Sequence, residues 1–179
     1  MTFIEIDRLL LRGWRDDDLA PFAAINADAT VMAHFPAILS RENSDALAMR
    51  FRRFLEVNHW GLYAVAVKSS ERFIGFVGFA RAEFAACFTP ATEIGWRLSL
   101  ASWGHGYATE AAWACIAHGF AVLGFGEIVS FTARSNGRSI AVMERIGMLR
   151  SAEEDFEHPS VPAGHALRDH VLYRITNPG

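Results

Sequence analysis

Apolar and polar residues follow two different periodicities along this chain, and each predicts a kind of element. Alternation predicts strands, because successive side chains of a strand point to opposite faces. Thr92 to Leu98 alternates in this way, and strands are also predicted over Phe3 to Arg12, Tyr63 to Lys68, Arg72 to Ala80, Glu127 to Ala133, Arg150 to Phe156 and Arg168 to Ile175. Helical spacing and capping residues predict helices from about Leu19 to Ala27, Arg41 to Asn58, Ala108 to Leu123, and Asn136 to near Gly147. Strands outnumber helices, and the mixture predicts a layered α/β fold.

One junction combines a strand, a glycine-containing turn and a helix. The turn is Gly104-His105-Gly106, and glycine lets the backbone bend sharply while an anion approaches its N–H groups. The helix that follows directs its unpaired N–H groups and positive dipole end into the turn. This junction predicts a phosphate-binding site, although Gly-x-Gly also occurs in ordinary turns.

Neighbouring segments fit one site with this turn. On the preceding strand, alternation divides the side chains between two faces, with Ile94, Trp96 and Leu98 on one and Glu93, Gly95 and Arg97 on the other. After the next strand, Asn136 is a predicted helix N-cap, and Gly147 is a predicted glycine just beyond the end of that helix.

Taken in order, these motifs resemble the GCN5-related N-acetyltransferase (GNAT) superfamily. More narrowly they resemble its RimJ/RimL branch, which acetylates N-terminal amines of ribosomal proteins and a range of other amines. The matching motifs are Glu93-Ile94-Gly95-Trp96, Trp103 to Ala111, Asn136-x-x-Ser139 and Glu144 to Met148. Segments similar to the branch's first strand and terminal hairpin are Asp7 to Arg12, His158-Pro159, Gly164-His165 and Leu167 to Arg174.

One position departs from the general superfamily pattern. Trp103 stands where most members carry Arg or Gln, and Trp is usual at this position in the RimJ/RimL branch. The departure implies that phosphate contacts rely on backbone N–H groups more than on a cationic side chain.

The resemblance implies an α/β GNAT-type three-layer fold, with a mixed, mostly antiparallel central sheet flanked by helices and a single domain over residues 1–179. It implies an N-acetyltransferase that moves an acetyl group from acetyl-CoA directly to a primary amine, either a protein N-terminal α-amine or a small-molecule amine. The alternative is a non-catalytic domain that binds or senses acyl-CoA. A third candidate is a nucleotide phosphotransferase that uses the glycine turn, and the absence of Gly-Lys-Ser/Thr after that turn argues strongly against it.

The resemblance also implies where acetyl-CoA binds. Its pyrophosphate is expected on the N–H groups of Trp103, Gly104, His105, Gly106, Tyr107, Ala108 and Thr109. Its peptide-like pantetheine arm is expected to pair with the backbone of Trp96, Arg97 and Leu98 as an extra strand. Asn136 stands where the family places a cofactor-contacting Asn, and capping its own helix is a competing or coexisting role. Tyr107 suits either the core or the cofactor.

Two residues are candidates for proton transfer. Glu93 occupies a Glu-Ile context like that of the general base in histone acetyltransferases, and a carboxylate beside aromatic residues has a raised pKa. The competing role of Glu93 is a salt bridge on the strand. Many superfamily members use a Tyr as acid on the helix after Asn136, and this helix has Met143 near that place and no Tyr. Ser139 carries the nearby hydroxyl. It is expected to act either as the acid or as a second capping residue of the helix.

The acceptor side gives weaker signals. Phe35, Trp60, Phe84 and His158 lie in or near loops that surround the acceptor in this superfamily, so they are expected to line the amine pocket. The spacing of His158, His165, Asp169 and His170 matches no compact metal-ligand motif, so no metal is expected.

Composition narrows the class of protein. A chain of 179 residues that is 51% hydrophobic has enough apolar residues for a sizeable core. The net charge is −3 and no run of Lys or Arg occurs, so no nucleic-acid partner is expected. Two cysteines, too few for a disulfide framework, and the lack of a signal-like start indicate a cytoplasmic protein. The longest apolar run, Ala111 to Gly126, is too short for a membrane span. The identity of the acceptor amine and the choice between monomer and homodimer stay open.

Overall fold

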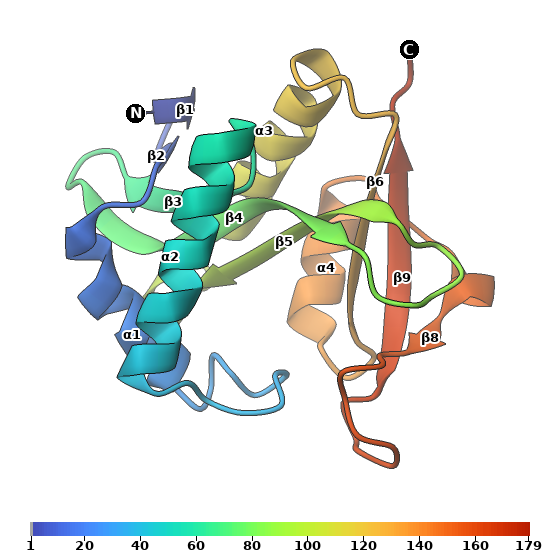
Figure 1. Ribbon diagram of the computed structural model, residues 1–179. Helices are drawn as coiled ribbons and strands as arrows, with labels where there is room; N and C mark the ends of the chain where they lie inside the picture. Colours follow the sequence, from blue (N-terminus) through green and yellow to red (C-terminus); the bar gives the residue numbers. More distant parts are fainter. Residues whose placement is uncertain (1) are drawn as a thin grey trace.

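A computed structural model describes residues 2–179. Within this range nine strands form one mixed, mostly antiparallel sheet, accompanied by four α-helices (Figure 1). The strands are β1 (Thr2–Glu5), β2 (Leu9–Arg12), β3 (Leu62–Val67), β4 (Arg72–Ala82), β5 (Ala91–Leu98), β6 (Glu127–Ala133), β7 (Leu149–Arg150), β8 (Phe156–Glu157) and β9 (Asp169–Thr176). The helices are α1 (Leu19–Ala27), α2 (Arg41–Asn58), α3 (Tyr107–Ala121) and α4 (Gly137–Arg145).

The sheet has one parallel junction in an otherwise antiparallel order. Strands β1 to β5 follow one another as antiparallel neighbours, β6 lies parallel to β5, and β9 runs antiparallel to β6. The short strands β7 and β8 both pair with β9. The parallel junction lies in the middle of the sheet, between its two antiparallel parts.

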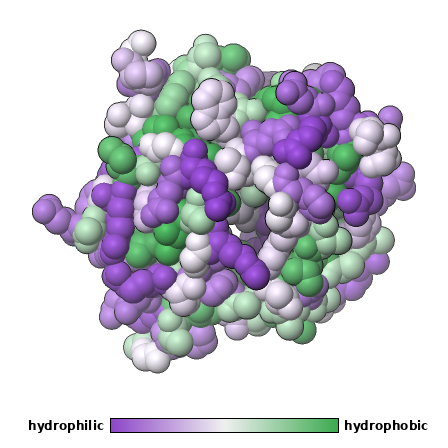
Figure 2. Space-filling model, turned by 180° about the vertical axis from the view of Figure 1, so that it is seen from behind, coloured by the Kyte–Doolittle hydropathy of each residue, from purple (hydrophilic) through white to green (hydrophobic). Residues whose placement is uncertain are grey.

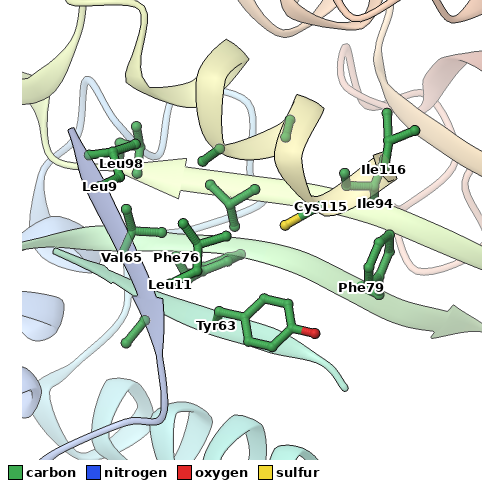
Figure 3. Packing of buried hydrophobic residues seen from close by; sticks show 14 of the residues in the cluster. Leu9, Leu11, Tyr63, Val65, Phe76, Phe79, Ile94, Leu98, Cys115 and Ile116 are labelled. Carbon is green, nitrogen blue, oxygen red and sulfur yellow. The ribbon is translucent and has the colours of Figure 1, made fainter. Parts of the chain in front are cut away.

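Helices cover both faces of the sheet, as expected for a three-layer fold (Figure 1). On one face, rings from α1 and α2 pack on β4, with Phe22 and Phe51 6.0 and 5.3 Å from Phe76 between ring centroids. On the other face, Cys115 and Ile116 of α3 lie on the sheet in the buried cluster (Figure 3). Close packing there requires Gly119, because a Cβ at this position would lie 2.9 Å from the ring of Phe79.

The outer surface on the α3 and α4 side mixes hydrophilic and hydrophobic residues (Figure 2). No helix among residues 2–179 combines the length and apolar character that crossing a bilayer demands.

Several predicted elements are confirmed at their predicted bounds: α1, α2 and β6. The prediction of one strand from Phe3 to Arg12 is wrong, because a turn separates β1 from β2. Ile6 N donates to Leu9 O at 3.1 Å in this turn, and β1 folds back on β2 as an antiparallel partner.

The strand predicted from Arg150 to Phe156 is also wrong, since the chain forms β7, a 3₁₀ turn over Ala152–Glu154 and then β8. Asp155 explains the interruption. Its carboxylate pairs with Arg134 and Arg150 and accepts a hydrogen bond from Leu172 N, so the segment curls around these partners.

Candidate active site

The strands β5 and β6 separate soon after they meet. Among the described residues they pair at one position, Glu93 with Val129. One step further, Ser130 Oγ donates to Ile94 O at 2.9 Å, so a side chain takes the place of the next ladder hydrogen bond. Beyond this point the strands diverge toward the side where the α1–α2 and β8–β9 loops lie (Figure 1). The sheet therefore contains a split that opens from Glu93.

The backbone of Trp96 faces this split. Ser99 N donates to Ile74 O of β4, and the alternation of an antiparallel ladder then turns the N–H and C=O of Arg97 toward β4 as well. Trp96 has the opposite orientation, with its N–H and C=O toward β6. Leu98 O already accepts the indole Nε1–H of Trp103 at 3.0 Å. Of the three strand residues expected to bind pantetheine, Trp96 is the one that offers both backbone groups to an extended ligand.

Glu93 lies at the closed end of the split, on the face covered by α1 and α2. The side chain is half-buried, and within residues 2–179 its carboxylate has no hydrogen-bond or ion-pair partner. Its Oε1 lies 3.6 Å from the place where a Cβ on Gly95 would be, so the carboxylate extends along the strand toward the open end. Burial raises the pKa of Glu93 to about 8. Glu93 forms no salt bridge within residues 2–179, so the structural alternative is not supported.

The glycine turn lies on the opposite face, before α3. Gly104 and Gly106 have φ angles of +77° and +78°, which side-chain-bearing residues rarely adopt. In the described chain, none of the backbone N–H groups from Gly104 to Thr109 donates a hydrogen bond to the protein, and nothing lies within 4 Å of a Cβ placed on Gly104. Such a row of free donors at a helix N-terminus fits the pyrophosphate of acetyl-CoA.

Trp103 supports the turn through its side chain instead of offering its backbone N–H to the pyrophosphate. Its N–H donates to Leu100 O at 3.1 Å, so it is not one of the free donors. Its indole fixes the end of β5, and the guanidinium of Arg138 from α4 lies 4.5 Å from the ring centroid. A cation from another helix thus stands next to the turn.

Arg8 is a second cation at the turn. Its Nη1 donates to His105 O at 3.0 Å, its Nε donates to Glu110 Oε2 at 2.6 Å, and its guanidinium lies 4.8 Å from the centroid of the Tyr107 ring. Arg8 therefore holds the backbone of the turn and neutralises a carboxylate in the first turn of α3.

Sequence reasoning missed Arg8 and Arg138 as site residues. Arg138 lies inside the Asn136-x-x-Ser139 motif, which is a usable signal. Arg8 is 102 residues from Glu110, and no local pattern links the two.

Asn136 and Ser139 form a local hydrogen-bonded pair at the start of α4. Asn136 Oδ1 accepts from Ser139 N at 3.3 Å, and its Nδ2 donates to Thr132 Oγ1 and Ser139 Oγ at 2.9 and 3.1 Å. The capping role of Asn136 is confirmed. Ser139 Oγ accepts in this pair, so its own proton is free to donate. Met143 is buried in the core.

The α1–α2 and β8–β9 loops border the open end of the split. His34 Nδ1 lies 3.4 Å from Ser135 Oγ, which joins the α1–α2 loop to the turn after β6. Phe35 in the same loop packs over Arg97, with 4.1 Å between the guanidinium carbon and the ring centroid.

A group of rings, the aromatic wall, borders the split on the β6 side; it consists of Phe84, Phe88, Phe131, Phe156, His158 and His170. It adjoins Glu93, because Val129, the residue paired with Glu93, packs in the same buried cluster. Burial lowers the pKa of both His158 and His170, which keeps their imidazoles neutral near pH 7.

Of the four residues expected in the acceptor pocket, Trp60 is not brought to the split. It follows the C-terminal end of α2 and packs with Phe54 and Phe125, whose ring centroids lie 5.1 and 5.3 Å away. Phe35 lies on one side of the split, and Phe84 and His158 belong to the aromatic wall on the other. Among residues 2–179, no three His, Cys, Asp or Glu side chains gather as a metal site.

Comparisons with known proteins identify the family and the fold. The model of a family described as "Acetyltransferase (GNAT) domain" matches residues 8–149. An N-acetyltransferase of Bacillus subtilis, YnaD, is 27% identical over 174 residues, covering 96% of this chain and 95% of the relative. The crystal structure of a GNAT-family acetyltransferase from Bacillus anthracis has a TM-score of 0.82 at 25% identity, covering 99% of this chain and 100% of that one. RimL, a ribosomal L7/L12 α-N-protein acetyltransferase solved in complex with coenzyme A, shares the fold at a TM-score of 0.77 and 15% identity, over 98% of each chain. This chain therefore belongs to the GNAT family and is an acetyl-CoA-dependent acetyltransferase.

Proposed function

We propose that this protein acetylates a primary amine by direct transfer, with Glu93 as the general base. The observation that carries the proposal is the place of Glu93, a carboxylate without a partner in residues 2–179, where β5 and β6 separate. Its pKa of about 8 makes it a stronger base than an ordinary carboxylate.

Binding of acetyl-CoA is assigned to backbone groups on the other face. The free N–H groups from Gly104 to Thr109 would hold the pyrophosphate, and the N–H and C=O of Trp96 would pair with the pantetheine arm. When bound, acetyl-CoA supplies a thioester, whose acyl group is already activated toward attack by an amine. A backbone N–H of β5 would polarise the acyl carbonyl, and the N–H of Trp96 faces the split.

Proton transfers complete the reaction. The amine nitrogen forms its bond to the acyl carbon as the carbon–sulfur bond breaks, and the sulfur leaves with the electron pair. Glu93 accepts the proton that the amine releases. Ser139 Oγ, whose proton is not used in its pair with Asn136, would donate to the leaving sulfur directly or through water; Ser139 then regains a proton from solvent and Glu93 releases its own. The products are an amide and a free thiol.

Turnover with a panel of amines separates this function from non-catalytic acyl-CoA binding. The protein is incubated with acetyl-CoA and either N-terminal peptides, amino acids, polyamines or simple alkylamines, and thiol release is followed. The proposal expects amine-dependent release of thiol together with the acetylated amine by mass spectrometry. Tight binding of acetyl-CoA without turnover on any of these amines would support the sensing domain instead.

A further inference from the structure

Arg97 is a charged residue on the same face of β5 as Glu93. Its guanidinium carbon lies 4.1 Å from the ring centroid of Phe35 and 5.5 Å from that of Phe76. Its Nη1 donates to Asn26 Oδ1 at 2.6 Å. The backbone holds it closely as well, because a Cβ on Gly75 would lie 2.1 Å from Arg97 O.

The charge of Arg97 has no counterion in the described chain. Asn26 is neutral, and its Nδ2 is used by Ser44 Oγ at 2.8 Å. The Nε of Arg97 is buried without any acceptor, and no carboxylate among residues 2–179 forms an ion pair with the guanidinium. Burial lowers the pKa of Arg97 to about 10. An unpaired charge in such surroundings is costly, which indicates that an anion completes the site.

Arg12 shows how this chain treats a buried arginine that has only a structural role. Its side chain is 4% exposed, and it donates to both carboxylate oxygens of Asp18, at 2.7 and 2.8 Å. Arg97 is the opposite case, because its Nη1 is bound to a neutral amide and its Nε and Nη2 have no acceptor within residues 2–179. The fork of a guanidinium matches a carboxylate, which can accept two hydrogen bonds from it.

The position of Arg97 relative to Glu93 sets the size of the ligand. The carboxylate of Glu93 extends over Gly95, and Arg97 is the next residue on that face, about 7 Å further along the strand. An amine held at Glu93 therefore reaches Arg97 with an anionic group only a few bonds from its nitrogen.

We propose that Arg97 binds a carboxylate of the acceptor, so that the acceptor is an amino acid or a similarly short amine with a carboxylate. This inference rests on the proposed function and names its substrate class. It favours amino carboxylates over polyamines, whose additional positive charges would lie against Arg97.

Matched pairs of amines test the inference. Glycine, β-alanine and 4-aminobutyrate are compared with methylamine, ethylamine and propylamine as acceptors at saturating acetyl-CoA, and spermidine and phosphoethanolamine are added. We expect kcat/KM to be about 10- to 100-fold higher for the best carboxylate than for its matched amine, because a hydrogen bond to a charged partner carries an energy of that order. A preference for phosphoethanolamine over every carboxylate would overturn the assignment to a carboxylate.

Two variants separate ligand binding from a purely structural role of Arg97. Arg97→Gln removes the charge and should bring kcat/KM for the carboxylate down to that of the matched amine. Asn26→Asp keeps Arg97 and supplies an internal carboxylate at its Nη1, so it should reduce the same preference without lowering the melting temperature. Arg53→Gln removes an exposed charge on α2 and is the control that keeps the wild-type preference.

The outcomes distinguish failure of carboxylate binding by Arg97 from failure of the proposed amine acetylation. If amines are acetylated equally with and without a carboxylate, or if spermidine is preferred, the function stands and the inference is overturned. If Asn26→Asp and Arg97→Gln both keep the full preference, Arg97 is not the receptor. If none of the amines is acetylated, the proposed function fails and the inference fails with it.

Discussion

The two faces of the β5–β6 split are built on different principles. On the α3 and α4 face, the donors from Gly104 to Thr109 are backbone groups of one continuous segment. On the α1 and α2 face, side chains from distant segments meet, and several have shifted pKa values: that of Glu93 is raised by burial, and those of Arg97 and His158 are lowered by it. The first face depends on backbone conformation and the second on the charge of individual side chains.

This difference predicts which changes affect binding and which affect rate or specificity. Substitutions that alter the turn should weaken the affinity for coenzyme A. Substitutions of side chains on the opposite face should leave that affinity and change the pH dependence or the choice of acceptor.

The largest effect is expected from Gly106→Glu. The substitution places a side chain at a φ of +78° and an additional negative charge beside the pyrophosphate site, so coenzyme A affinity by calorimetry should fall at least about 100-fold. Gly124→Glu is the matched control, because Gly124 has a φ of +71° with open space around it and lies beyond the end of α3. Equal affinities in the two variants would contradict the assignment of the turn.

A smaller effect, about 10-fold, is expected when the support of the turn is removed. Arg8→Gln leaves Glu110 as an unpaired negative charge near the pyrophosphate and releases His105 O. The double variant with Glu110→Gln removes that charge as well, so part of the lost affinity for coenzyme A should return. Losses that simply add in the double variant would show that Arg8 does not act through Glu110.

Arg138→Gln should have a lesser effect, a few-fold at low salt. Arg138 is exposed on α4 and contacts Trp103, so its attraction to phosphate is screened by ions. The affinity for coenzyme A, measured by titration at two salt concentrations, should differ from that of the wild type mainly at the lower one. A loss of the same size at both would point to a role for Arg138 in packing.

The same contrast explains what the sequence could predict. The turn, the start of α3 and the cap at Asn136 depend on a few consecutive residues, and local pattern and glycine chemistry were enough to place them. Glu93 was placed on the correct face by alternation, and its lack of a partner became visible only in the fold.

Predictions failed where tertiary contacts overrode local pattern. The strand-like run from Phe3 to Arg12 predicts one continuous strand, yet the chain turns at Ile6 to Arg8, and Arg8 is bound by Glu110, 102 residues away. The position of Trp60 near a loop predicts a place in the acceptor pocket with Phe35, whereas Trp60 packs with Phe125. The missing counterion of Arg97 depends on which distant carboxylates do not approach it, and no spacing in the sequence contains that information.

Stability gives an independent view of Glu93. The folded protein keeps the Glu93 proton up to about pH 8, whereas the unfolded chain releases it near the ordinary glutamate pKa of about 4.3. The folded state therefore binds more protons in this window, and stability falls as pH rises through it. Glu93→Gln removes this loss, so its melting temperature should exceed that of the wild type at pH 8 and equal it near pH 4. A constant difference at all pH values would indicate an effect of packing alone.

The most direct test of the account is the pH dependence of kcat/KM in the wild type and in Glu93→Gln, with coenzyme A affinity measured alongside. The wild-type rate should rise with pH through an inflection near 8, as Glu93 loses its proton and becomes a base. Glu93→Gln should bind coenzyme A normally, lose that inflection and fall about 100-fold in rate at pH 8. An unchanged inflection in the variant would contradict the assignment of Glu93 as the base.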